Sequence, residues 1–188
     1  MKKLHLLGLA LCFLFVSFSA NAQFEVKINP IGALFQSPDV SVEYIVNDDF
    51  GVEGKLGFAW SNNDVLGSEV RSNGLSLAVL GKYYFGPQEG ADRFYTGMYG
   101  KFRTNNSSSN DVGVLSYNNT RLALGVVFGY KWVGDNGIVL DINLGLGRAL
   151  VNNFKFDDPN DEIYEDALSL GNFDAISTIA LGYRFPGK

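Results

Sequence analysis

Apolar and polar residues alternate with a period of two along most of the chain. Because successive side chains of a β-strand point to opposite faces, this alternation predicts strands rather than helices. The clearest strand places its large apolar residues on one face: Phe50, Val52, Leu56, Phe58 and Trp60. The whole pattern predicts eight strands, at residues 24–35, 40–47, 50–60, 73–85, 92–104, 119–133, 138–149 and 174–185. In the first of these, we expect Pro30 to mark a bulge.

The connections between these strands alternate in length. The second, fourth and sixth are short, whereas three of the others are long, polar and rich in Asn, Ser, Asp and Gly: 61–72, 105–118 and 150–173. Short turns at one end and long loops at the other are typical of β-barrels that span the bacterial outer membrane. The sequence therefore predicts an all-β fold, namely an eight-stranded antiparallel transmembrane up-and-down β-barrel.

Charged residues lie almost entirely on the strand face opposite to the apolar one; Asp92, at a strand end, is the exception. A Lys or Arg that faces lipid at the middle of the bilayer costs about 2–4 kcal/mol, so the charged faces are expected to line the lumen. Buried charges must pair, which predicts a structural charge network. Its expected members are Glu43, Glu53, Lys55, Lys82, Lys101, Arg121, Asp141 and Arg148. The alternative is a proton- or ion-conducting file.

Large aromatic residues occur near the strand ends on the apolar faces. In a membrane barrel they would form the two interfacial girdles, with Trp60, Phe85, Phe102, Tyr130 and Trp132 as examples. The competing interpretation is a soluble lipocalin-like barrel, whose apolar face would point inward around a ligand. Its exterior would then consist mostly of Gly and Ala with few Lys or Glu, which is unusual for a solvated surface.

The N-terminus has the features of a secretory signal peptide. Lys2 and Lys3 form a basic start, residues 6–18 are mostly apolar, and an Ala-Asn-Ala sequence follows. This arrangement predicts a signal peptide at residues 1–22 and an outer-membrane barrel domain at residues 23–188. An apolar segment of this length is too short for a membrane anchor helix.

The only histidine and the only cysteine, His5 and Cys12, lie in that predicted signal peptide. The mature chain would then lack the residues of Ser-His-Asp and Cys-His catalysis and the usual ligands of zinc. We therefore expect no enzyme activity, no metal and no cofactor. The 15 basic and 20 acidic residues give a formal net charge of −5, which argues against a nucleic-acid partner.

The most charged segment of the chain is the predicted last loop, which contains six carboxylates within ten residues: Asp157, Asp158, Asp161, Glu162, Glu165 and Asp166. Such a loop could gather Ca²⁺ and bridge it to lipopolysaccharide phosphates, although the ligand spacing of a known calcium loop is absent. The simpler interpretation is a solvated acidic outer loop.

Three short segments carry a resemblance to a known family: Ile-Asn-Pro-Ile-Gly at 28–32, Val-Glu-Tyr at 42–44 and Asn-Asp-Asp-Phe-Gly-Val-Glu at 47–53. With the predicted architecture, they make the chain resemble the small eight-stranded outer-membrane barrels of the OmpA/OmpX type, closest to an uncharacterised Gram-negative family. The resemblance implies contact with outer-membrane lipid and lipopolysaccharide, and insertion by the barrel-assembly machinery. An even strand number places both termini in the periplasm and the long loops outside the cell.

Similar barrels serve as envelope scaffolds, adhesins or defence factors, and some modify lipid. The expected function is thus non-enzymatic, an envelope structural or surface-interaction role through the long extracellular loops, with a surface ligand that the sequence does not identify. The alternative is a narrow channel for ions or small solutes. A lipid-modifying enzyme would need Asp, Ser or Tyr chemistry without histidine.

Overall fold

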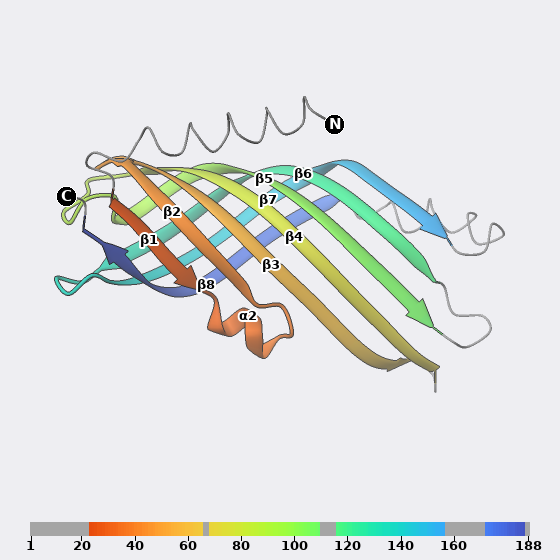
Figure 1. Cartoon of the computed structure of the whole chain (residues 1–188). Helices are drawn as coiled ribbons and strands as arrows, with labels where there is room; N and C mark the ends of the chain where they lie inside the picture. Colours follow the sequence, from red (N-terminus) through yellow and green to blue (C-terminus); the bar gives the residue numbers. More distant parts are fainter. Residues whose placement is uncertain (1–22, 66–67, 110–115, 157–171, 187–188) are drawn as a thin grey trace, which may run out of the picture.

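Eight antiparallel strands form one closed barrel in the order β1-β2-β3-β4-β5-β6-β7-β8 (Figure 1). The computed structural model describes residues 23–65, 68–109, 116–156 and 172–186. The strands are β1 (Gln23–Ile28), β2 (Asp39–Asn47), β3 (Phe50–Val65), β4 (Ser68–Tyr84), β5 (Arg93–Ser109), β6 (Tyr117–Val133), β7 (Ile138–Phe156) and β8 (Phe173–Phe185). The predicted eight-stranded antiparallel barrel is therefore confirmed, as is the architectural resemblance to small outer-membrane barrels. The predicted signal peptide lies outside the described residues.

The first strand is shorter than its sequence pattern predicted. It ends at Ile28, and the short helix α2 (Pro30–Leu34) follows, so the expected bulge at Pro30 is wrong. Asn29 caps this helix, because its side chain accepts a hydrogen bond from the amide of Gly32 at 2.9 Å. Proline suits the first turn of a helix, where its missing N–H has no partner to lose. No helix among the described residues is long and apolar enough to cross a membrane.

The three segments predicted to be long loops contain much more strand than expected. β3 continues to Val65, β5 to Ser109 and β7 to Phe156, and the next strands start at Ser68, Tyr117 and Phe173. These extensions are polar at most positions, so they lack the alternation by which strands are recognised. A hairpin that has water on both faces needs only its backbone hydrogen bonds, not an apolar face.

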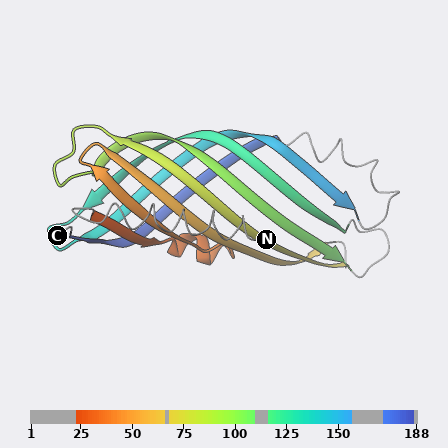
Figure 2. The same ribbon diagram turned by 45° about the horizontal axis from the view of Figure 1, so that its top comes forward.

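The barrel has two unlike ends (Figures 1 and 2). The terminus end carries Gln23, Phe185 and the short connections at 48–49, 85–92 and 134–137. The far end carries the long extensions of β3 to β7. The wall is uneven in length, because β1 has 6 residues whereas β7 has 19. In both views α2 lies beside the wall, well short of the far end.

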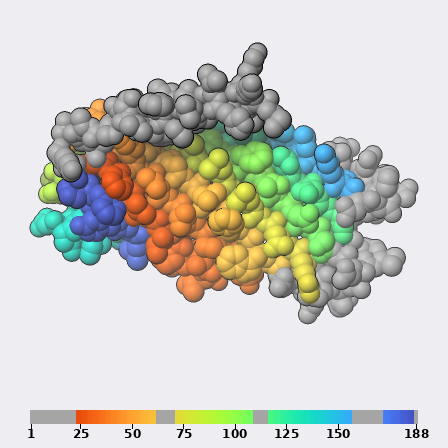
Figure 3. All heavy atoms as spheres, in the orientation of Figure 1, coloured from red at the N-terminus to blue at the C-terminus, as the bar shows by residue number. Residues whose placement is uncertain are grey.

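The outward face of the barrel is apolar. Large side chains such as Val126, Phe128 and Leu144 are exposed there, and the predicted girdle aromatics all lie on this face as well. The side chains of β2, β3 and β4 cover the side turned to the viewer in the space-filling representation (Figure 3). An apolar exterior of this extent is unstable in water but matches the hydrocarbon of a bilayer, so this is a membrane-spanning barrel.

Candidate functional site: the lumen of the barrel

Eight charged side chains fill the half of the lumen nearer the terminus end, and we name this group the plug. It contains four acids and four bases: Glu25, Glu43, Glu53, Asp141, Lys27, Lys82, Lys131 and Arg184. None of the eight is more than 7% exposed. They come from seven strands of the wall, all except β5, at the positions that alternate with the apolar outward residues.

Two lysines lie at the centre of the plug, between three carboxylates. The Nζ atom of Lys27 is 2.6 Å from Glu43, 3.1 Å from Glu53 and 2.8 Å from Asp141. Lys82 contacts the same three carboxylates, at 3.0 Å from Glu43 and 2.7 Å from Asp141. The carboxylate oxygens are close enough together to hold a metal ion. However, the two ammonium groups already supply the positive charge that this acidic cluster requires.

A second layer of contacts connects this centre to the terminus end. Lys131 lies 3.1 Å from Glu25 and 3.0 Å from Glu43. Arg184 pairs with Glu25 at 2.6 Å and also donates to the carbonyl of Ala91 at 3.1 Å. Because Ala91 belongs to the connection between β4 and β5, the plug also ties this turn to β8.

Three tyrosines complete the filling of the lumen. Tyr84 donates to Glu43 at 2.5 Å and Tyr95 to Asp141 at 2.7 Å. Tyr99, farther from the terminus end, donates to Asp174 at 2.8 Å. The Tyr95 ring also faces the Lys82 ammonium at 4.6 Å, a cation–π contact. Tyr95 and Tyr99 donate to carboxylate oxygens that the lysines leave available, whereas Tyr84 shares its Glu43 oxygen with Lys131.

Glycines on the neighbouring strand β6, directly across from Tyr95 and Tyr99 of β5, make room for the tyrosine rings. A Cβ atom at Gly125 would lie 2.5 Å from the Tyr99 ring, and one at Gly129 would lie 2.5 Å from the Tyr95 ring. Atoms cannot approach this closely, so side chains larger than hydrogen at these inward positions would displace the rings. Glycine and tyrosine thus fill the lumen as complementary pairs.

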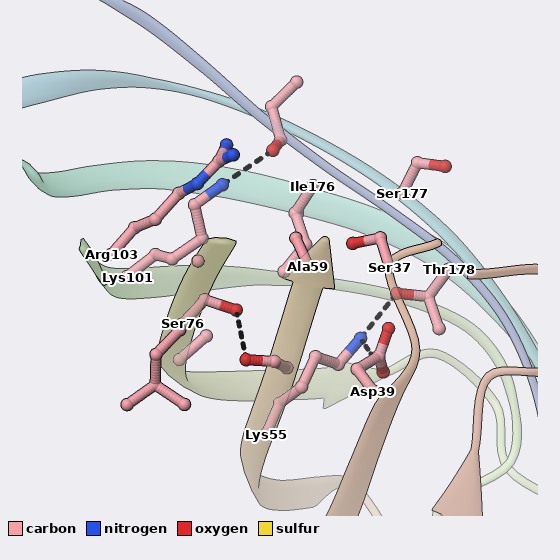
Figure 4. A pocket seen from close by; sticks show the side chains of 15 residues that line it. Ser37, Asp39, Lys55, Ala59, Ser76, Lys101, Arg103, Ile176, Ser177 and Thr178 are labelled. Atoms are coloured by element: carbon pink, nitrogen blue, oxygen red, sulfur yellow. Dashed lines mark hydrogen bonds and ion pairs between the residues drawn. The ribbon is translucent and has the colours of Figure 1, made fainter. Parts of the chain in front are cut away.

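Beyond Tyr99, toward the far end, the lumen opens into a cavity of about 200 Å³, which we name the basic chamber (Figure 4). Lys55 enters it from β3 and donates to Thr178 at 2.5 Å, with Asp39 at 3.5 Å. Lys101 enters from β5, pairs with Asp174 at 2.8 Å and donates to the carbonyl of Ala175 at 2.9 Å.

The basic chamber and its rim hold more cations than carboxylates. Lys55 and Lys101 are accompanied by Arg103 and Arg121, which are directly paired across β5 and β6 and both occupy inward positions. Arg103 donates from Nε to Asn105 at 2.9 Å, and Arg121 donates to the carbonyl of Phe173. The carboxylates described here are Asp39 and Asp174. Hence the described residues of this half of the lumen are basic on balance, whereas those of the plug are neutral.

The predicted network residues divide between these two regions. Glu43, Glu53, Lys82 and Asp141 meet in the plug, whereas Lys55, Lys101 and Arg121 lie in or beside the basic chamber.

The prediction for Arg148 is wrong, because its side chain is exposed on the outward face. The alternation in β7 runs unbroken from Ile138 to Leu146 and continues to Arg148, so Arg148 shares the outward face with Leu144 and Leu146. It pairs with Phe173, the first residue of β8, and so lies toward the far end of the barrel. The cost of an outward-facing charge falls to about 0–1 kcal/mol near the membrane interface.

Several lumen residues were missed in the sequence although the pattern contained them. Glu25 and Lys27 alternate with Phe24 and Val26 in the same way as the residues that were found. Lys131 and Arg184 likewise follow the alternation of their strands. The three tyrosines carried no such signal, because a tyrosine fits the outward aromatic girdles equally well. The acidic residues at 157–166 lie outside the described part of the chain.

Comparison with known structures returns small barrels from bacterial surfaces. Neisserial surface protein A shares 14% identity at a TM-score of 0.43, over 88% of this chain and 95% of the other. A major outer membrane protein from Thermus thermophilus shares 18% identity at a TM-score of 0.45, over 87% and 99% of the two chains. No curated protein sequence matches significantly. Residues 7–169 match the family described as "Protein of unknown function (DUF3575)", and the chain belongs to this family.

Proposed function

We propose that this protein is a non-conducting barrel of the bacterial outer membrane with a structural or surface-interaction role in the envelope. In this proposal both termini face the periplasm, and the far end, with its long polar hairpins, faces outward. The observation that supports it is the plug, in which matched charges fill the half of the lumen nearer the terminus end.

The plug argues against a narrow channel for three reasons. Its acids and bases balance, its side chains are buried, and its two central ammonium groups are each held by three carboxylates. A hydrated ion would have to displace a lysine from contacts at 2.6–3.1 Å, which leaves buried carboxylates unpaired. An eight-stranded barrel is also just wide enough for its own side chains to fill. The lumen is thus better suited to rigidity than to transport.

The composition of the two ends supports the proposed orientation. Outer-membrane barrels keep short turns on the periplasmic side and longer segments outside. Here the connection between β2 and β3 consists only of Asp48 and Asp49, whereas β7 extends to Phe156 at the other end. Partners would therefore meet the far end. The lipid-modifying enzyme considered from the sequence has no supporting observation among the described lumen residues.

A deletion strain of the source bacterium tests this function most directly. We expect altered adhesion or a raised envelope-stress response, with unchanged uptake of small solutes. Complementation with the full-length gene should restore the wild-type state. Reduced solute uptake in the deletion strain, restored by the gene, would favour the channel instead.

Topology is tested separately by protease treatment of whole cells. The proposal predicts cleavage within the far-end hairpins of intact cells, whereas the turn at 48–49 becomes accessible only after the outer membrane is permeabilised. Cleavage of that turn in intact cells would contradict the proposed orientation.

A further inference from the structure

The barrel wall has a gap on one side in its far half. β8 pairs with β1 only as far as the Leu181–Ile28 pair, and its residues 173–180 continue beyond the end of β1. On the other side of the gap, residues 36–38 continue along β3, since Trp60 and Phe58 donate to the carbonyls of Gln36 and Pro38 at 3.0 Å. Among the described residues, α2 is the element that lies between these two edges, packed against β8 (Figures 1 and 2).

The basic chamber reaches this gap. Ser37 and Asp39 line it from one edge, and four consecutive residues of β8, from Ala175 to Thr178, line it from the other (Figure 4). Within these four, Ala175 and Ser177 occupy outward positions of the strand. A cavity confined to the lumen would meet β8 mainly through its inward residues. The chamber therefore extends to the side of the barrel as well as toward the far end.

The interior of the chamber is suited to an anion. Lys55 is 7% exposed, and its ammonium group lies among the lining residues. Arg103 faces Arg121 across neighbouring strands, an arrangement in which like charges repel. Among the described residues, no carboxylate forms a salt bridge with Arg103. An anion bound beside Arg103 and Lys101 would offset this repulsion and accept charge-assisted hydrogen bonds.

The exterior of the gap is suited to a hydrocarbon chain. The segment Pro30–Phe35 contains no charged residue, and its Leu34 and Phe35 side chains are 78% and 77% exposed. Phe58 and Trp60, next to this segment on β3, are exposed as well. An apolar surface beside a gap in the wall allows an acyl chain to stay in the bilayer while its head group enters the chamber.

We infer that the basic chamber binds an anionic amphiphile with one acyl chain, whose carboxylate or phosphate lies against Arg103 and Lys101 while the chain leaves between α2 and β8. The volume supports this division, since about 200 Å³ equals the space of roughly seven water molecules. That space admits a head group but not a sixteen-carbon chain. Binding of this amphiphile requires that the barrel lies in the membrane, but it does not require that the plug closes the lumen. The inference therefore goes beyond the proposed function.

Photo-crosslinking of the full-length protein in lipid nanodiscs tests the inference. The probes are palmitate and palmitoyl lysophosphatidate, each with a diazirine in the acyl chain, and the matching neutral hexadecanol and cationic hexadecyltrimethylammonium. We expect both anionic probes to label residues 30–38 and 173–179, and the other two probes to label these residues at least about tenfold less. Stronger labelling by one anionic probe distinguishes a fatty acid from a lipid phosphate as the source.

Two arginine positions provide the test variant and its matched controls. R103Q removes a cation of the chamber and should lower labelling by the anionic probes about tenfold, since hydrogen bonds to charged groups make a substantial contribution to binding. R103K should retain most of the labelling. R148Q removes an arginine from the outward face and should leave labelling unchanged. Heat-dependent gel mobility verifies that each variant is folded.

Three outcomes would overturn the inference. In the first, hexadecanol labels the gap as strongly as palmitate; in the second, R103Q labels like the wild type. The third is competition by butyrate or inorganic phosphate as effective as that by palmitate, which would indicate a site for soluble anions. Conductance measured on the same preparation reports on the plug separately, so failure of one proposal does not imply failure of the other.

Discussion

Each charged side chain of the plug is stabilised by the opposite charges that other strands place beside it. Lys82 shows the strength of this dependence, because its ammonium group contacts Glu43, Glu53 and Asp141 at once. Removing one member of a buried ion pair leaves an uncompensated charge, which costs about 3–5 kcal/mol. The plug residues should therefore be far less tolerant of substitution than charged residues elsewhere on the barrel.

The substitution Lys82→Met tests this dependence. It keeps the length of the side chain but leaves four acids and three bases in the plug, so we expect a loss of about 3–5 kcal/mol of unfolding free energy. Urea unfolding in liposomes, followed by tryptophan fluorescence, measures it. Lys155→Met, at an exposed position of β7, is the control and should change stability by less than about 0.5 kcal/mol. Equal effects of the two substitutions would mean that the plug is not a stabilising network.

Glycine at the inward positions is required by the tyrosines. Gly125→Ala would place a Cβ atom 2.5 Å from both the Tyr99 ring and the carbonyl of Leu146, so we expect a destabilisation of about 1–3 kcal/mol. Gly54→Ala meets no atom within 4 Å and is the matched control. It should be neutral or stabilising by about 0.5–1 kcal/mol, because alanine restricts the unfolded chain. The same unfolding assay decides, and a Gly125→Ala variant as stable as the wild type would contradict tight filling of the lumen.

At the scale of single elements, a strand can be predicted from the sequence where one of its faces contacts lipid. The parts of the strands that extend beyond the lipid cannot be predicted in this way. The sequence predicts β3 from Phe50 to Trp60 because apolar residues alternate there with small or charged ones. Its last five residues, 61–65, have no such alternation, as expected for a hairpin that extends beyond the bilayer. Arg148 lies near this boundary. The alternation of β7 places its side chain on the outward face, whereas its charge favours the prediction that it lines the lumen.

The helix α2 shows a second limit of the sequence pattern. Its residues are apolar and follow a strand directly, so the strand pattern predicts that they continue this strand through Pro30. The Asn29–Pro30 start is a helix signal, but five residues are too few for helical periodicity to be detected. The gap in the wall follows from this early end of β1 and could not be predicted from the strand pattern.

The depth of β7 in the bilayer gives a prediction for this element. Leu144 is 57% exposed near the middle of the apolar stretch, so Leu144→Arg should cost about 2–4 kcal/mol. Leu150→Arg, on the same face but beyond Arg148, should cost only about 0–1 kcal/mol. Unfolding free energies in liposomes provide the comparison. Equal costs at both positions would contradict a lipid-facing wall that ends near Arg148.

At the scale of the whole molecule, the lumen has two parts with different electrostatics. The plug near the terminus end is neutral, buried and filled, whereas the basic chamber toward the far end is open and, among the described residues, has more cations than carboxylates. The sequence predicted that charges would line the lumen, because each strand reveals which residues share a face. It could not separate the two parts, because that requires the register and the stagger between strands far apart in the chain.

This division predicts how the plug could be opened. The double substitution Glu53→Ser and Lys82→Ser removes one acid and one base that contact each other, so the remaining charges stay balanced. It also replaces two long side chains by short ones at the centre of the lumen. We expect a water-filled path and ion conductance in this variant, provided that heat-dependent gel mobility shows a folded barrel.

Single-channel recording in planar bilayers, with potassium chloride on both sides, tests the closed lumen most directly. We predict a flat current trace for the wild-type protein and steady steps for the folded Glu53→Ser, Lys82→Ser variant. Steady steps from the wild-type protein, equal in size to those of the variant, would contradict a plug that closes the barrel.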